Sequence, residues 1–130
     1  MAVSKEKLEK LLKFWDVHEC KFGSDEPGFE LSTHSPEGEE VCLSLYGDTI
    51  EEMANVALAA ATDFDPDGHA AVIYHVKQYG TADEKRFYAG APDSLKDLLH
   101  DAKWIKRAYM DAAKTLARSA KSTARKRAGK

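Results

Sequence analysis

The fold is decided by residues 29–46, FELSTHSPEGEEVCLSLY. Apolar and polar side chains alternate on both sides of a Ser-Pro-Glu-Gly turn, which is typical of a β-hairpin with one buried face. Residues 14–20 alternate in the same way and end at the turn-forming residues 23–28. Together these segments predict an antiparallel meander of three strands.

Helix signals flank the meander on both sides. Ser4 is a good N-cap for a helix over residues 4–13, and Thr49 with Glu52 forms a capping box for a helix over residues 49–62. A long helix starts at residues 92–94 and keeps its apolar spacing to Leu116.

The stretch between the last two helices contains β-branched and aromatic side chains at residues 71–76, which predicts a fourth strand, followed by a loop over residues 79–90. The element order is then α-β-β-β-α-β-α. This order predicts the α+β class, with a three- to four-stranded antiparallel sheet and helices packed on one face.

The chain length of 130 residues and the 43% hydrophobic content favour one domain, over residues 1–116. Beyond Leu116 only alanines supply apolar side chains, so residues 117–130 are expected to form a basic tail that frays or is disordered when free. No apolar stretch approaches the roughly 20 residues that span a bilayer, and the N-terminal segment is charged rather than signal-like. We therefore expect a cytoplasmic protein without a membrane partner.

Charge is segregated along the chain, although the net charge is only −3. Residues 18–101 contain 18 acidic and 5 basic residues, whereas residues 114–130 contain 7 basic residues and no acidic one. An acidic body repels nucleic acid and favours basic protein surfaces, and a basic tail is suited to phosphates. The alternative for either charge run is a solvated face.

A candidate zinc site combines two imidazoles and two thiols, at His18, Cys20, His34 and Cys42. If the hairpin turns are centred near residues 26 and 38, His18 pairs with His34 and His34 pairs with Cys42, with Cys20 on the same face. The spacing of ordinary zinc modules is absent. The alternative is a polar strand face with two free thiols.

Motifs of known enzymes are not found in the sequence: there is no phosphate-binding glycine loop, no nucleophile elbow and no His-Glu-x-x-His pair. Residues 63–68, DFDPDG, match the first half of a calcium loop, but Tyr74 stands where the bidentate Glu belongs, which favours a simple helix-ending turn. The sequence thus predicts a protein that is not an enzyme. A nucleophilic Cys20 or Cys42 beside a histidine stays open as an alternative.

Three segments carry a family resemblance: HSPEGEEV at residues 34–41, DFDPDGHAA at residues 63–71 and GAPDSLKDLLHDA at residues 90–102. Through them the chain resembles a family of small uncharacterised proteins carried by phages and integrative elements of gut Gram-positive bacteria. The family has no established catalytic residues to carry over. The resemblance implies the setting in which inhibitors of host defence occur, such as anti-CRISPR or antirestriction proteins.

The acidic body and this resemblance lead to one functional expectation: an anti-CRISPR type of inhibitor that binds a basic surface of an RNA-guided nuclease and blocks nucleic-acid loading. The expected contacts are acidic side chains and one aromatic anchor on the last helix, namely Glu37, Glu39, Glu40, Asp65, Asp67 and Trp104. Two alternatives are a zinc-stabilised structural or regulatory module and a DNA-associated accessory protein that uses the basic tail. Direct nucleic-acid binding is expected only through that tail.

Overall fold

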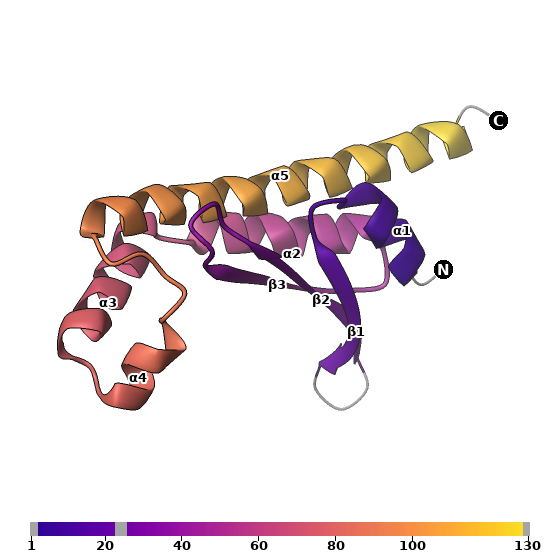
Figure 1. The fold of residues 1–130 in the computed structure, drawn as a ribbon. Helices are drawn as coiled ribbons and strands as arrows, with labels where there is room; N and C mark the ends of the chain where they lie inside the picture. The colour runs from indigo at the N-terminus through magenta and orange to yellow at the C-terminus, as the bar shows by residue number, and fades with distance from the viewer. Residues whose placement is uncertain (1–2, 23–25, 129–130) are drawn as a thin grey trace.

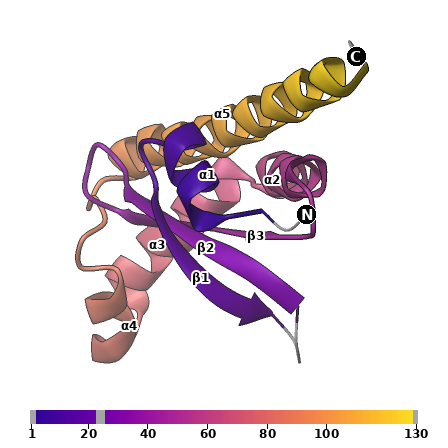
Figure 2. The same ribbon diagram turned by 90° about the vertical axis from the view of Figure 1, so that its right-hand side faces the viewer.

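Three antiparallel strands form a sheet in the order β1-β2-β3 in the computed structural model of the chain (Figure 1). They are β1 (Asp16–Phe22), β2 (Glu26–His34) and β3 (Glu40–Tyr46). Helices cover one face of the sheet, as the turned view shows (Figure 2). The predicted α+β class and the predicted meander are therefore confirmed.

The structure describes the backbone of residues 3–22 and 26–128, and the side chains of residues 3–20 and 28–122. These residues form five helices, which are α1 (Lys5–Leu11), α2 (Ile50–Asp63), α3 (Pro66–Tyr79), α4 (Ala82–Phe87) and α5 (Leu95–Ala128). Among them, no helix combines the length and the apolar character needed to cross a membrane.

The main core lies between the sheet and the helices α1, α2 and α5. Apolar side chains occupy odd-numbered strand positions and are buried, because successive side chains of a strand point to opposite faces. This buried set comprises Val17, Phe29, Leu31, Val41, Leu43 and Leu45. Removing each of the larger side chains from water contributes roughly 1.5–3 kcal/mol, so the alternating pattern is the main determinant of this layer.

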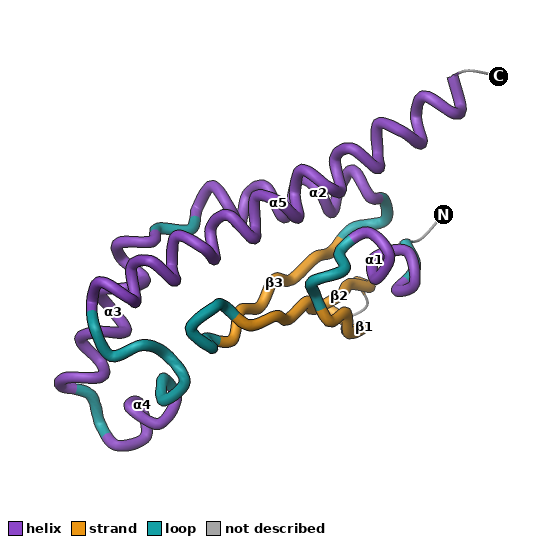
Figure 3. The backbone as a smooth tube through the Cα atoms, turned by 45° about the horizontal axis from the view of Figure 1, so that its top comes forward, coloured by secondary structure: helices purple, strands orange, loops and turns teal. Residues whose placement is uncertain are grey.

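The helices α2 and α5 pack along each other, and Figure 3 shows them side by side. Buried alanines on α2, including Ala57 and Ala61, leave room for a close approach. Lys106 on α5 donates to the carbonyl oxygens of Ala61 (2.6 Å) and Phe64 (2.8 Å) at the carboxyl end of α2. It thereby satisfies acceptors that have no partner within α2.

The predicted fourth strand is wrong, because residues 71–76 lie within α3. Pro66 is the first residue of this helix, and Ala70 and Ile73 are both buried in a cluster with Ala91 and Leu98. Two residues three apart share one face of a helix but lie on opposite faces of a strand. Tertiary packing of this pair therefore outweighs the strand propensity of the segment.

The predicted loop contains the short helix α4, which begins with a capping box between Thr81 and Glu84. The start of α5 is where the sequence predicts it, since the backbone N–H of Asp97 donates to Ser94 Oγ at 3.1 Å. The backbone stays helical through Ala128. Fraying or disorder of the free tail, residues 117–130, stays a prediction.

A second, smaller apolar cluster lies between α3 and the amino end of α5. Its buried members are Ala70, Ile73, Ala91 and Leu98. Lys77 on α3 donates to the carbonyl oxygen of Ala91 and pairs with Asp93 at 2.8 Å. These polar contacts hold α3 against the segment that leads into α5.

Candidate functional site

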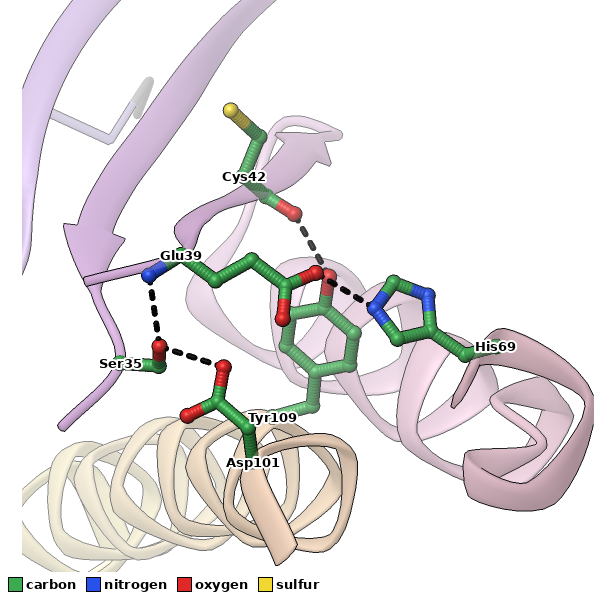
Figure 4. A network of polar contacts seen from close by, with 6 residues as sticks. All are labelled: Ser35, Glu39, Cys42, His69, Asp101 and Tyr109. Carbon is green, nitrogen blue, oxygen red and sulfur yellow. Dashed lines mark hydrogen bonds and ion pairs between the residues drawn. The ribbon is translucent and has the colours of Figure 1, made fainter. Parts of the chain in front are cut away.

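A buried polar network joins the turn between β2 and β3 to the helices α3 and α5 (Figure 4). Ser35 Oγ donates to Asp101 Oδ2 at 2.6 Å and accepts from the backbone N–H of Glu39 at 2.8 Å. His69 Nε2 donates to Glu39 Oε1, also at 2.6 Å. Asp101 is 0% exposed and Glu39 is 8% exposed, so both carboxyl groups belong to the interior.

The turn itself positions two members of the network. The backbone N–H of Ser35 donates to the Glu39 carbonyl oxygen, and that of Gly38 donates to the Ser35 carbonyl oxygen, both at 2.9 Å. Gly38 has a φ of 94°, a left-handed conformation that glycine adopts without a Cβ clash. The Ser-Pro-Glu-Gly turn recognised in the sequence thus serves to bring Ser35 and Glu39 onto α5.

Glu39 and Asp101 form a pair of buried carboxyl groups. Glu39 Oε2 and Asp101 Oδ1 are buried and have no hydrogen-bond partner among the described residues. The two groups influence each other's ionisation. We infer that the pair holds one proton, because two carboxylates have no donor between them and would leave both buried oxygens unsatisfied.

The opposite pKa shifts of the two groups assign this proton to Asp101. Burial raises the pKa of Asp101, and the interaction with the Glu39 carboxyl group raises it further, to about 6. Burial also opposes ionisation of Glu39, but the hydrogen bond from His69 and the interaction with Asp101 outweigh it, so the pKa of Glu39 falls below its ordinary value. The pair therefore holds one negative charge between the lowered pKa of Glu39 and about pH 6, on the carboxylate that faces His69.

The network is arranged to join segments rather than to activate a nucleophile. Ser35 is only 5% exposed, and its hydroxyl donates to a carboxyl group rather than to an imidazole. His69 contacts Glu39 instead. The described residues of this network therefore do not form the serine–histidine couple of acyl-transfer enzymes.

Sequence reasoning missed Ser35, His69 and Asp101 as partners. Ser35 and Asp101 are 66 residues apart in the chain, so no local spacing indicates their contact. One signal was present: all four members lie in the three segments singled out from the sequence, residues 34–41, 63–71 and 90–102. The structure brings these segments together at the network (Figure 4).

The second feature of interest is the face of the sheet opposite the described helices, which we call the open face (Figure 2). Even-numbered strand residues point to it, including the exposed carboxylates Asp16, Glu30 and Glu40 and the exposed histidines His18 and His34. No Lys or Arg occupies any of its positions whose side chains the structure describes. The open face is therefore acidic.

The four candidate zinc ligands share the open face but do not form the expected row. His18 pairs with Glu30, His34 with Glu40, Cys20 with Gly28 and Cys42 with Ser32. Both turns are centred earlier in the chain than expected, so the predicted pairings of His18 with His34 and of His34 with Cys42 are wrong. Among the described residues, no three His, Cys, Asp or Glu side chains are placed to hold a metal ion. Zinc binding stays a prediction.

The pKa values of the two thiols on the open face are shifted by burial and by the carboxylates of this face. Burial raises the pKa of the Cys20 and Cys42 thiols, and the nearby Glu30 raises both further, together with Glu40 for Cys42. A thiol with a raised pKa stays protonated at neutral pH and is a poor nucleophile. The arrangement therefore disfavours cysteine catalysis on this face.

The predicted contact residues fall into two groups. Glu37, Glu40, Asp65 and Asp67 are exposed. Because His69 bonds to Glu39, the amino end of α3 with its two aspartates lies next to the β2–β3 turn. Glu39 itself must be corrected, since its side chain is buried in the polar network and is not available as a surface contact.

Trp104 is half-buried and packs against the main core. Its remaining exposed surface lines a hollow of about 330 Å3 together with Phe14, Trp15, Thr33, Arg107, Ala108 and Asp111. Trp104 as an interface anchor stays a prediction.

Comparison of the chain with protein-family models, with curated proteins and with solved structures found no match.

Proposed function

We propose that this protein is a non-catalytic inhibitor that docks its open face on a basic, nucleic-acid-binding surface of another protein. One observation carries the proposal: Asp16, Glu30 and Glu40 lie together on an uncovered sheet without a Lys or Arg at any described position of that face. Complementary charge speeds encounter and selects basic partners over other proteins.

The strand scaffold supports this role. Hydrogen-bonded pairing fixes the backbone of all three strands, so the carboxylates are held in place before binding and little backbone order is lost on association. Glu37, at the turn, and Asp65 and Asp67, at the start of α3, extend the acidic surface past the end of the sheet.

The target class that we propose is an RNA-guided nuclease. The resemblance to proteins of phages and mobile elements supplies the setting, and such nucleases hold their guide–target duplex in a positively charged channel. A protein that occupies the channel with its open face would prevent nucleic acid from loading.

The test compares two triple variants with the same change in net charge. The first neutralises the open face (Asp16→Asn, Glu30→Gln, Glu40→Gln). The second neutralises three exposed carboxylates on helices (Glu9→Gln, Glu51→Gln, Asp83→Asn). Each is titrated against a panel of purified RNA-guided nucleases, and loading of a labelled target DNA is measured by anisotropy.

We expect the open-face variant to lose at least about tenfold in affinity and the helix variant to lose much less, because attraction is strongest between charges closer than the Debye length of about 8 Å. Binding of the wild-type protein should also weaken as salt rises. Equal losses in both variants, salt-independent affinity, or binding that leaves DNA loading intact would contradict the proposal.

A further inference from the structure

On the helix-covered side of the molecule, two hollows lie next to each other between the α1–β1 turn and α5. One has a volume of about 370 Å3 and the other of about 330 Å3. Phe14, Trp15 and Asp111 line both of them. The two hollows therefore form one surface, which we call the aromatic groove.

The side chain of Phe14 stands in the solvent within this groove. It is 90% exposed, although an aromatic ring gains free energy from burial. The turn beneath it is held by a hydrogen bond from the Trp15 N–H to the Leu12 carbonyl oxygen at 3.0 Å. Nothing in the packing of the main core requires an aromatic residue at this position.

The base of the groove is rigid. Trp15 is 9% exposed and stacks on Tyr109, with ring centroids 6.3 Å apart. Tyr109 in turn donates from its hydroxyl to the carbonyl oxygen of Cys42 on β3, at 2.8 Å. Phe14 therefore extends from a fixed aromatic layer and not from a loose loop.

The rim of the groove is basic. Lys13 comes from the turn, and Arg107, Lys114 and Arg118 follow one another at helical spacing along α5. Asp111 is the only acidic residue among the lining residues. Among the described side chains, none of the four cations forms an ion pair with a carboxylate.

We propose that the aromatic groove binds single-stranded nucleic acid, with an unpaired base stacked on Phe14 and the phosphates held by Lys13, Lys114 and Arg118. Exposed aromatic rings beside a track of cations are what sequence-tolerant single-strand binding uses. The positive charge of the rim selects an anionic ligand. The two hollows lie on either side of the exposed Phe14 ring, and this shape suits a flat base better than an acidic peptide.

This site goes beyond the proposed inhibitor function, because it lies on the opposite side of the sheet from the open face. A protein bound at the open face would leave the groove accessible. The chain would then hold a basic protein surface with one side and a single strand with the other.

The experiment measures binding of a labelled oligothymidine, roughly 15 nucleotides long, to the full chain by anisotropy over a range of salt concentrations. For Phe14→Ala we expect roughly a tenfold loss of affinity with an unchanged salt slope, because stacking is lost and no phosphate contact changes. Lys114→Ala with Arg118→Ala should weaken binding and reduce the slope by about 1 to 2 units.

Phe87→Ala is the matched control, since Phe87 is 80% exposed on α4, which lies at the opposite end of the molecule from α1 (Figure 1), and it should bind like the wild type. Circular dichroism confirms that each variant folds. The proposal fails if Phe14→Ala binds like the wild type, or if duplex DNA binds as tightly as the single strand. It also fails if polyglutamate displaces the oligonucleotide at equal charge concentration, which would indicate an acidic polypeptide as the ligand.

Discussion

The two apolar clusters of this protein are built in different ways. The main core uses large side chains that alternate along strands or recur along helices, and six of its strand residues are buried. The small cluster under α3 consists of Ala70, Ile73, Ala91 and Leu98. Between them lies the polar network of Ser35, Glu39, His69 and Asp101. The helix α3 is therefore held by polar contacts and a small apolar cluster, whereas the sheet is held by the burial of large apolar side chains.

The largest effect is expected in the main core. Leu31 is 0% exposed on the central strand β2, so Leu31→Ala removes buried methyl groups and leaves a cavity. We expect a loss of about 3 to 5 kcal/mol in the free energy of unfolding, measured by urea denaturation. A loss below about 1 kcal/mol would mean that the sheet is not the main source of stability.

A smaller effect is expected under α3. Ile73→Ala should reduce stability by about 2 kcal/mol, near the low end for such substitutions, because a small cluster next to solvent can close around the lost atoms. Hydrogen exchange should speed up along α3 while the strands stay protected. Uniform acceleration over all elements would contradict the view that α3 is a separate unit.

The acid pair between the clusters predicts a pH dependence. The pKa of Asp101 is raised from 3.8 to about 6, so its stabilisation is complete below 3.8 and is lost as pH rises through 6. The lowered pKa of Glu39 acts in the opposite sense, with stabilisation present above 4.5 and lost as pH falls through the lowered value. Stability should therefore be highest between pH 3.8 and pH 4.5, where both contributions are largely present.

Asp101→Asn tests this assignment, because an amide can donate to Glu39 and accept from Ser35 as the protonated acid does. We expect the variant to lose the decline in stability between pH 3.8 and about pH 6. We place this decline at about 1 to 2 kcal/mol, since one pKa unit corresponds to about 1.4 kcal/mol and the two carboxyl groups partly offset each other. Asp111→Asn, an exposed carboxyl on the same helix, should keep the wild-type profile. Identical profiles for all three proteins would refute the shared proton.

The smallest effect concerns one hydrogen bond at the edge of the main core. Tyr109→Phe removes the bond to the Cys42 carbonyl oxygen but keeps the stacking on Trp15. We expect a loss of about 1 kcal/mol, with little change in tryptophan fluorescence. A shift of the emission maximum would show that the hydroxyl positions the ring as well.

The contrast between the clusters also explains what could be predicted from the sequence. The meander, α1, α2 and the start of α5 follow from alternation, helical spacing and capping residues, all of which are local. The helix α3 could not be predicted in this way, because Val72, Ile73 and Val76 favour a strand. The helix is favoured by the burial of Ile73 against Ala91 and Leu98, which are distant in the sequence. Similarly, the exposure of Glu40 follows from strand parity, whereas the burial of Glu39 depends on Asp101, far along the chain.

The length of α5 has a consequence for the behaviour of the molecule in solution. Its 34 residues extend about 51 Å at 1.5 Å per residue, whereas a compact domain of this size has a radius of gyration of about 14 Å. The carboxyl-terminal part of α5 projects beyond the rest of the molecule (Figure 3). Friction is greater for an elongated particle than for a sphere of equal mass, so a monomer should elute early from a sizing column. Light scattering, which responds to mass and not to shape, is then the measurement that reports the oligomeric state.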